Sequence, residues 1–475
     1  MKIFLAACRV IVGTLFVISG LIKANDPSGF SYKLEEYFTV FSTDLGTVKK
    51  EVPAEIDEKI KNSPCFSKLN IPKQYEQEAI PRGQLGFFKR SLIDLFGFMG
   101  ENALFLAVLI CIIEIILGLF TIVGYRMRLV AWLLFLMIVF FTFLTFYSAY
   151  YNKVTDCGCF GDALKLTPWQ SFSKDIFLLA FILPLFIWQR RINGIPLNRY
   201  EIGISVSSLV LMTILCTVQF KWLFPVWFLA VFVIVRIALA RRFSPVQQEM
   251  LNLLLVLIAS TWFTVYCISH LSVRDYRPWR NGNNVRELTQ YTPEVAEIVM
   301  VYLDNSTCEE KKMPTTDWSW LDSTFEATHT FYKQDKKVIK PAIEPKVKDF
   351  TLEDPNTGET HGEEFINFPG YAFLWIAPKL EKASLRHMDR INAIAEYAMG
   401  NNMMFAGATS STSDVIDKFR HDNQNMFPIY QNDEKALKTI LRSNPGLVLI
   451  RDGVVVNKWH YNDFPKAETI REKYR

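Results

Sequence analysis

Two cysteines separated by one glycine, Cys157 and Cys159 in "VTDCGCFGD", are the residues of this chain best suited to chemistry. A disulfide needs Cα atoms about 4.4–6.8 Å apart, close to the longest separation that residues i and i+2 reach in an extended chain. A bridge between them requires a turn at Gly158 and would be strained. Because a strained disulfide is more easily reduced, the pair favours thiol–disulfide redox chemistry over a structural staple.

Two other interpretations of this motif remain open. One is a tight glycine-containing turn in which the cysteines are incidental. The other is a metal site, which is the least favoured because no histidine lies near the motif in the sequence. The histidines are His270, His329, His361, His387, His421 and His460. We therefore expect no metal.

The residues after the motif predict the start of a helix. In "TPWQ", Thr167 is a candidate N-cap, Pro168 suits the first helical position, and Gln170 stands where a capping box places its return hydrogen bond. If the cysteine loop folds back over this helix end, the positive end of the helix dipole would favour a thiolate.

The loop that contains Cys157 and Cys159 lies between long apolar stretches of the chain. Half of the residues are hydrophobic, and a helix needs roughly 17 to 25 apolar residues to cross a hydrocarbon core of about 30 Å. Seven stretches qualify and predict an α-helical polytopic membrane bundle in the lipid bilayer: 3–24, 101–122, 127–149, 170–189, 201–219, 222–240 and 248–269. The formal net charge of +4 is too small to indicate nucleic acid as a partner.

The basic loops predict the orientation of this bundle. Arginines gather between the second and third, fourth and fifth, and sixth and seventh stretches, and short cytoplasmic loops are enriched in them. They are Arg126, Arg128, Arg190, Arg191, Arg199, Arg241 and Arg242. The N-terminus is then cytoplasmic. The loop 25–100, the cysteine motif and everything beyond residue 270 lie outside, which in a bacterial inner membrane is the periplasm, where disulfides form.

The predicted orientation divides the other cysteines into those within the spans and those on the outer side. Cys8, Cys111, Cys216 and Cys267 fall within or at the ends of predicted spans, where a thiol behaves as a small buried hydrophobe. Cys65 and Cys308 fall outside. Cys65 is a candidate third catalytic thiol that attacks a Cys157–Cys159 bridge or receives its electrons. It is equally interpretable as a free cysteine without a catalytic role. Cys308 either pairs with Cys65 or stands free.

Two ionisable residues lie inside apolar stretches, Arg9 in the first and Glu114 in the second. Counting 1.5 Å per residue places them about 10 Å and roughly 12 Å from the inner face, so we expect them to pair. The pair is either a structural contact that fixes the register of two helices or a site for a proton or a quinone head group. Lys23 and Asp26, at the outer end of the first span, are expected to reach water or the interface.

The rest of the chain is polar. Residues 271–345 read as a periplasmic connecting region with one strand candidate, 297–305. From 346 onward strands alternate with helices, which predicts an α/β domain at 346–475. The expected strands are 371–377, 403–409, 427–431 and a hairpin in 446–459, and the expected helices are 382–401, 413–422, 433–443 and one near the C-terminus.

The N-terminal part resembles a known family. "RVIVGTLFVISGLIKANDP", with its Arg, "GxxF", "SGLxK" and following "DP", resembles DoxX-type membrane proteins, and "CGCFGD" is similar to the methylamine utilisation MauE branch. That branch has a four-helix fold akin to the vitamin K epoxide reductase type. The resemblance covers 1–195, followed by three further helices in 196–270. It implies periplasmic electron transfer or disulfide formation linked to quinone, with Cys157 and Cys159 as the paired cysteines.

The last 130 residues resemble a thioredoxin-like domain of the TlpA type. "RSNPGLVLIRDGVVV" fits the segment where that fold carries its cis-proline, here Pro445. Where thioredoxins have CxxC, this chain has "IAPKLEK", and no cysteine follows Cys308. The domain therefore cannot perform dithiol exchange by itself.

Two functions follow. The first is an enzyme, an inner-membrane thiol oxidoreductase in which Cys157 and Cys159 pass electrons toward a quinone while the C-terminal domain presents a protein substrate. The second is a non-catalytic anchor or subunit of an envelope complex, whose redox-inactive thioredoxin-like domain binds partner proteins. A transporter is disfavoured because few polar residues besides Arg9 and Glu114 stand out within the apolar stretches.

Overall fold

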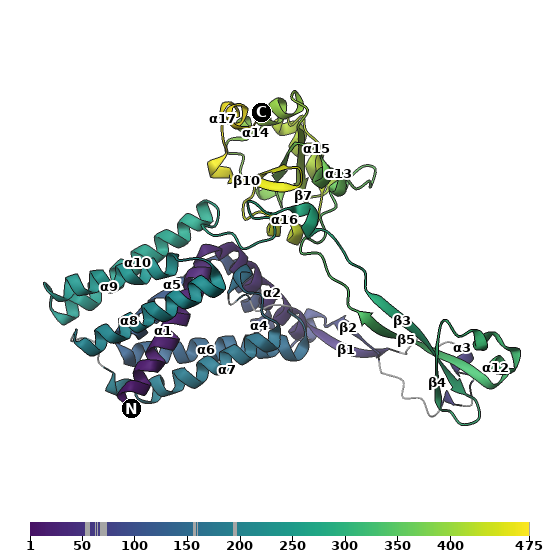
Figure 1. Ribbon diagram of the computed structural model, residues 1–475, viewed down its shortest axis with the longest axis horizontal. Helices are drawn as coiled ribbons and strands as arrows, with labels where there is room; N and C mark the ends of the chain where they lie inside the picture. Colours follow the sequence, from purple (N-terminus) through teal and green to yellow (C-terminus); the bar gives the residue numbers. More distant parts are fainter. Residues whose placement is uncertain are drawn as a thin grey trace. The chain divides into compact units, whose positions relative to one another are not determined.

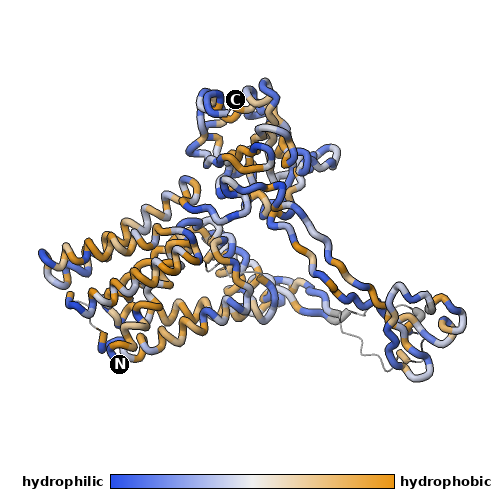
Figure 2. Tube along the Cα trace, viewed as in Figure 1, coloured by the Kyte–Doolittle hydropathy of each residue, from blue (hydrophilic) through white to orange (hydrophobic). Residues whose placement is uncertain are grey.

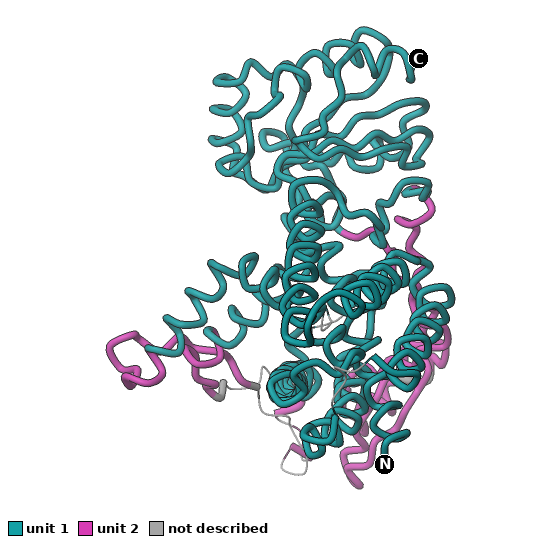
Figure 3. The backbone as a smooth tube through the Cα atoms, turned by 90° about the vertical axis from the view of Figure 1, so that its left-hand side faces the viewer, with its two compact units in different colours: residues 1–42, 91–285, 349–475 teal, residues 43–90, 286–348 magenta. Residues whose placement is uncertain are grey.

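The computed structural model describes residues 1–52, 58–61, 63, 65–66, 74–154, 158, 160–192 and 197–474. Cys157 and Cys159 lie outside these residues. The described chain forms two compact units, coloured teal and magenta in Figure 3. The first comprises 1–42, 91–285 and 349–475, and the second comprises 43–90 and 286–348.

The first unit contains the apolar helices that the sequence predicts. They are α1 (Lys2–Asn25), α5 (Ala103–Val123), α6 (Met127–Tyr151), α7 (Pro168–Ile187), α8 (Arg199–Leu215), α9 (Phe224–Ala240) and α10 (Pro245–Ser269) (Figure 1). Six helices of the described chain are long and apolar enough to cross a membrane, with α8 extended to Phe220 by a π-helical turn; α9, with 17 residues, is shorter. Figure 2 shows these helices as largely hydrophobic. A helix satisfies its own backbone polar groups, so such segments suit the interior of a bilayer.

Glycines allow α1 and α5 to pack closely. A Cβ at Gly13 would lie 2.5 Å from Ile122 Cγ1 and 2.8 Å from the carbonyl oxygen of Gly118. A Cβ at Gly118 would lie 2.7 Å from the backbone nitrogen of Val17, and one at Gly20 would lie 2.8 Å from Ile115 Cγ1. Small residues that bring backbones together are typical of helix contacts within membranes. This contact fixes which residues of the two helices face each other.

Two further helices fall in the stretch predicted as the outer loop 25–100. They are α2 (Pro27–Gly46), which begins directly after α1, and α4 (Phe87–Glu101), which leads into α5. Phe30, Leu34 and Phe38 of α2 belong to the same apolar core as α1 and α5. Phe38 stacks on Phe96 of α4, with ring centroids 6.2 Å apart.

The C-terminal part of the first unit is an α/β region with a five-stranded sheet in the order β10-β9-β6-β7-β8. Strands β6, β7 and β8 are parallel, while β9 is antiparallel to both β6 and β10. Its elements are α13 (Gly362–Asn367), β6 (Tyr371–Ile376), α14 (Met388–Met399), β7 (Met404–Thr409), α15 (Ser413–Asn423), β8 (Ile429–Gln431), α16 (Glu434–Ile440), β9 (Gly446–Arg451), β10 (Val454–His460) and α17 (Ala467–Lys473).

The predicted alternation of strands and helices is confirmed in this region, because each expected element is present. The clearest difference is the start of α14, expected at residue 382 and found at Met388. A short 3-10 turn at Leu380–Lys382 occupies the expected start, and Leu380 is buried there. The peptide bond between Asn444 and Pro445, before β9, is cis.

The second unit combines two segments that are far apart in the sequence. In one, β1 (Thr47–Val52) pairs with β2 (Gln74–Ala79), with the short helix α3 (Glu58–Lys61) between them. In the other, β3 (Val295–Asp304), β4 (Glu310–Pro314) and β5 (His329–Lys340) form an antiparallel sheet in the order β4-β3-β5. The short helices α11 (Val285–Leu288) and α12 (Ser323–Thr328) complete this part. Strand β3 overlaps the strand candidate 297–305 and begins two residues before it.

Candidate functional site

The described residues around the cysteine motif form a tight turn. Gly158 has φ +67°, in the left-handed region that favours glycine, and its carbonyl oxygen accepts a hydrogen bond from the backbone of Gly161 at 3.0 Å. A Cβ at Gly158 would lie 3.0 Å from Cγ of Lys33 on α2. The turn therefore packs against α2.

The helix after the motif begins as predicted. The side-chain oxygen of Thr167 accepts a hydrogen bond from the backbone N–H of Gln170 at 3.3 Å. The Gln170 side chain in turn accepts one from the backbone N–H of Thr167 at 3.0 Å. This capping box, with Pro168 in the first turn, fixes the start of α7 close to the motif.

The predicted pair between Arg9 and Glu114 is wrong. Arg9 instead pairs with Glu201 on α8, with Nη2–Oε2 at 2.6 Å and Nη1–Oε1 at 3.0 Å. Its Nε and Nη2 also donate to the carbonyl oxygens of Thr121 and Ile122 at 3.0 and 2.7 Å. Such a bidentate pair is a strong, geometrically specific contact, and it joins α1, α5 and α8.

Helix register explains this error. The glycine contacts place Gly20 opposite Ile115 and Gly13 opposite Gly118 and Ile122. Arg9, one turn before Gly13, therefore faces the last turn of α5. The sequence argument assumed that the first helix begins at the depth where the second ends, and this assumption placed Glu114 too close to Arg9.

Glu114 instead pairs with Lys23. Lys23 Nζ lies 2.5 Å from Glu114 Oε1, and the Ser19 hydroxyl donates to Glu114 Oε2 at 3.1 Å. The expectation that Lys23 reaches water is also wrong, because the residue is only 2% exposed. The rings of Phe30 and Phe141 cover it, with centroids 4.9 and 4.5 Å from Nζ. Because α2 folds back over the end of α1, this lysine is kept from solvent.

A second group of charges lies beside this pair on α7. Lys174 Nζ is 2.9 Å from Asp175 Oδ1, and the hydroxyl of Thr145 donates to Asp175 Oδ2 at 3.0 Å. Lys174 Nζ lies 5.2 Å from the ring centroid of Phe160, one residue after the motif. The signal for these residues in the sequence is weak, because charges in the first turns of a span resemble an ordinary polar helix end.

These charges surround a small cavity of about 40 Å³ within the helices. Its lining includes Ser19, Lys23, Glu114, Lys174 and Asp175, together with Phe16, Phe141 and Phe160. A water molecule needs about 10–15 Å³ on this scale, so the space suits a few waters and is too small for a quinone ring. It is therefore suited to holding and moving protons between buried ionisable groups.

Arg236 on α9 is another buried ionisable residue that the sequence argument missed. It is 2% exposed, and its guanidinium lies 5.4 Å from the ring centroid of Tyr125. The single Arg within "VFVIVRIALA" was the available signal. Together with the buried Glu201, it makes the interior of the bundle more polar than the sequence argument allowed.

The basic loops gather at one end of the helices. Arg191 Nη1 lies 3.4 Å from Sδ of Met1, and the hydroxyl of Tyr200 donates to the carbonyl oxygen of Lys2 at 2.6 Å. Arg126, at the start of α6, pairs with Glu249 near the start of α10 at 3.0 Å. This shared end is the one that the arginine pattern assigns to the cytoplasm; the assignment itself stays a prediction.

At the other end, a charged network joins the helices to the α/β region. Arg442, after α16, pairs with Asp26 at 3.0 Å and with Asp162 at 3.3 Å. Asp162 lies three residues after Cys159. Burial opposes ionisation of Asp26, but the guanidinium groups of Arg442 and Arg277 outweigh it and hold the pKa of Asp26 below its usual range. The α/β region is thus fixed both to α1 and to the loop of the motif.

A second ion cluster supports this junction. Asp275, after α10, accepts from Arg277 Nε at 2.8 Å and also pairs with Lys458 of β10. Burial, together with the nearby charge of Arg277, lowers the pKa of Lys458 to about 7. The sequence argument identified none of these residues, since their partners are up to 183 positions away.

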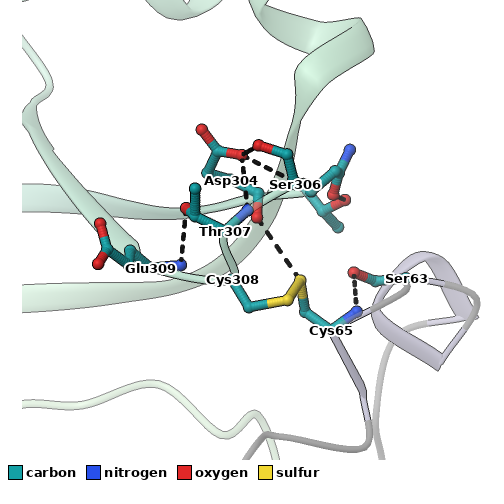
Figure 4. Close-up of a disulfide and its surroundings, with 9 residues drawn as sticks. Ser63, Cys65, Asp304, Ser306, Thr307, Cys308 and Glu309 are labelled. Atoms are coloured by element: carbon teal, nitrogen blue, oxygen red, sulfur yellow. Dashed lines mark hydrogen bonds between the residues drawn. A yellow bond between two sulfur atoms is a disulfide. The ribbon is translucent and has the colours of Figure 1, made fainter.

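Cys65 and Cys308 form a disulfide in the second unit, with Cα atoms 5.4 Å apart (Figure 4). This is one of the alternatives that the sequence left open. While the bond is intact, Cys65 has no free thiol with which to attack another bridge. Cys8, Cys111, Cys216 and Cys267 are free and buried, as predicted. No cluster of three His, Cys, Asp or Glu side chains within the described ranges could hold a metal ion.

The fold and these buried charges define a multi-pass membrane protein. Residues 80–188 match the model of the family described as Methylamine utilisation protein MauE, and this stretch includes α4 to α7 and the cysteine motif. Over this region the chain is similar to MauE, which indicates a membrane protein in a redox or electron-transfer process. Comparison of the whole chain with curated proteins and with solved structures found no match.

Proposed function

We propose that this chain is a membrane thiol–disulfide oxidoreductase of the bacterial inner membrane, in which Cys157 and Cys159 act on protein thiols on the periplasmic side. A substrate dithiol would reduce the Cys157–Cys159 disulfide and become a disulfide itself. The protein dithiol would then pass two electrons and two protons to a quinone, which becomes a quinol. Each step conserves electrons and protons, and the cysteine pair returns to its oxidised form.

The observation that carries this proposal is the setting of the motif. Gly158 forms a left-handed turn against Lys33, and Phe160 lines the cavity that contains Lys23, Glu114, Lys174 and Asp175. The described residues on both sides of the cysteines therefore lie next to buried ionisable groups at the outer end of the helices. Thiol oxidation releases protons and quinone reduction consumes them, so a proton-holding site beside the thiols suits this chemistry.

The two predicted cofactor residues take different roles in this proposal. Arg9 is engaged by Glu201 and by two carbonyl oxygens, so we assign it to holding α1, α5 and α8 together. Glu114 is assigned to proton transfer, since Ser19 and Lys23 contact it and all three residues line the cavity. The quinone ring would bind outside this cavity, at the lipid-facing side of the helices.

We assign the C-terminal region to a thioredoxin-like domain that binds protein partners. Its strand order supports this, because a parallel pair, β6 and β7, is flanked on the β6 side by two successive antiparallel strands, β9 and β10. The segment after β6, Ile376–Lys382, contains no cysteine. Its contribution would be to position a substrate near the motif to which Arg442 joins it.

A non-catalytic anchor is the second candidate function. The absence of any cysteine after Cys308 favours it, and so does the ion network that fixes the α/β region to the helices. In this case Cys157 and Cys159 would be inert, and the chain would serve a larger envelope complex.

Thiol trapping in intact cells separates the two. We expect Cys157 and Cys159 to be found in both oxidised and reduced forms, with the ratio changing when respiration is blocked. Replacement of both by alanine should leave substrate thiols reduced, whereas the matched control Cys8→Ala, at a buried free cysteine, should not. A pair that never changes its oxidation state, with substrate thiols unaffected by the double substitution, would refute the oxidoreductase and leave the anchor.

A further inference from the structure

A second cavity, of about 60 Å³, lies at the junction of the helices and the α/β region. Its lining comes from the end of α1, the start of α2, the turn at Gly158 and Gly161, the segment 272–277 and Arg442. Lys23 lines both cavities, but Arg274 and Arg277, which line only this one of the two, take no part in the thiol chemistry proposed above. Its carboxylates all contact a cation, whereas two of its arginines have a nitrogen without a hydrogen-bond partner in the described chain.

The carboxylates around the cavity are already neutralised. Asp26 and Asp162 both pair with Arg442. Asp275 accepts two hydrogen bonds from Arg277, at 2.8 and 3.1 Å, and pairs with Lys458 as well. Each negative group of the lining therefore has a cation in direct contact.

Two arginines of the lining, Arg274 and Arg277, each have a nitrogen that donates no hydrogen bond within the described chain. Arg277 is 2% exposed, and its Nη1 is buried without a hydrogen-bond partner among the residues that the structure describes. The same holds for Nε of Arg274, whose guanidinium lies 5.9 Å from the ring centroid of Tyr276. A buried donor that hydrogen-bonds nothing is costly, especially on a charged group. Two such donors at one cavity point to an absent anionic ligand.

We propose that this cavity binds a phosphate-type oxyanion through Arg274 and Arg277. The guanidinium fork matches phosphate geometry and favours it over a single hydrogen-bonding water. At about 10–15 Å³ per water, the volume corresponds to roughly four to six waters, which suits a compact group of five heavy atoms. The oxyanion is either a free phosphate or the phosphate of a lipid head group, since the cavity begins at the outer end of a membrane helix.

The bound anion would strengthen the attachment of the α/β region. It would join the segment after α10, through Arg274 and Arg277, to the same cavity that Arg442 of the α/β region lines. It would also offset the positive charge that Arg277 and Arg442 place near Lys458. Binding should therefore stabilise the full chain.

The test is titration of inorganic phosphate into the full-length protein, stripped of lipid in a neutral sugar detergent, by calorimetry and by thermal melting. We expect saturable binding below about 10 mM and a melting temperature that rises with phosphate concentration. Arg274→Gln and Arg277→Met should each weaken the affinity roughly tenfold or more, since each removes one charged donor. The control Arg280→Gln, at an exposed arginine three residues after Arg277 whose Nε donates to Asn283 Oδ1, should bind as the parent does.

If Arg277→Met fails to fold, Arg274→Gln still tests the proposal. Arg274 is only partly buried and forms no ion pair with a carboxylate of the described residues, so we expect this variant to fold. Competition by a short-chain soluble phospholipid would assign the site to a lipid head group, and absence of competition would assign it to the free ion. No phosphate binding by the parent, or equal binding by the parent and Arg274→Gln, would overturn the proposal. Neither result bears on whether Cys157 and Cys159 react.

Discussion

At the scale of single residues, buried ions in the membrane-spanning helices are the main feature of this chain. Arg9, Lys23, Glu114 and Glu201 are each nearly inaccessible, and each has a charged partner. Removing one partner of a buried pair leaves an uncompensated charge, which costs far more than removing both. This asymmetry provides a direct test of the pairing.

We predict that Arg9→Met and Glu201→Met each destabilise the protein by about 3–5 kcal/mol, whereas the double variant recovers most of the loss. Thermal melting of the purified chain in detergent measures this. The control is Glu36→Gln, which removes the partly exposed pair with Lys33 and should cost about 1 kcal/mol or less. Additive losses in the double variant would show that Arg9 and Glu201 do not act as a pair.

The sequence predicted that Arg9 and Glu114 are important but not which residues they contact. An ionisable residue in an apolar run is visible in the sequence, because bilayers exclude unpaired charge. Its partner depends on the depth at which each helix begins, and one helical turn moves a side chain by about 5.4 Å. Glu201 lies 192 positions from Arg9, so no local pattern links them.

At the scale of secondary-structure elements, the packing of α1 against α5 controls the site. Gly13, Gly20 and Gly118 lie where added Cβ atoms would meet the opposite helix. That contact brings Glu114 to Lys23 and Arg9 to the end of α5. A bulky side chain here would separate the helices and disrupt both contacts.

We expect Gly118→Leu to abolish folding or to lower the melting temperature sharply, because its Cβ would meet the backbone of Val17 and Gly13. The matched control is Gly203→Leu in α8, where no atom lies within 4 Å of an added Cβ. Fluorescence-detected gel filtration and thermal melting compare the two. Equal behaviour of the variants would contradict the close contact of α1 and α5.

Most elements could be predicted from the sequence because each carries its own signal. Apolar runs of sufficient length predicted the seven apolar helices, although not α2 and α4, and "TPWQ" marked the start of α7 through its cap. The strands of the α/β region are short apolar runs between turn residues, as in Tyr371–Ile376. By contrast, β4 and β5 are rich in lysine, so a search for apolar strands does not find them.

At the scale of the whole molecule, ion pairs join parts of the first unit that are remote in sequence. Arg442 lies 416 positions from Asp26 and 280 from Asp162. Burial opposes ionisation of Asp26, but Arg442 and Arg277 hold its pKa below the usual value. The contact is therefore at full strength above the ordinary aspartate pKa of about 4 and is lost as the pH falls through the lower pKa of the folded state.

We predict that Asp26→Asn destabilises the chain by about 1.5–3 kcal/mol at pH 7, and by progressively less as the pH falls below about 4. Melting temperatures of the parent and the variant across this range measure the effect. Arg442→Met should abolish the same pH dependence, because the aspartate then loses its principal partner. A difference between parent and Asp26→Asn that stays constant with pH would contradict the assignment of the low pKa to Asp26.

The division into units was the least predictable feature. Residues 271–345 were expected to connect two parts of the chain, yet 295–340 contain a three-stranded sheet, and their unit is linked to the segment 43–90 through Cys65 and Cys308. The separation of these cysteines by 243 positions gives no local signal. Sequence reasoning finds elements from local patterns, while the pairing of remote segments depends on the folded chain.

The most direct test of the proposed function is quinone reduction by the purified protein in which Cys157 and Cys159 are reduced and the Cys65–Cys308 disulfide is intact. With a soluble short-chain quinone under anaerobic conditions, we predict one quinol for each chain as Cys157 and Cys159 become a disulfide, followed by ultraviolet absorbance. Glu114→Gln should slow this step without changing the final yield. The Cys157→Ala and Cys159→Ala variants should form none. No quinol from the parent, or the same yield from both cysteine variants, would contradict the proposal that this motif passes electrons to a quinone.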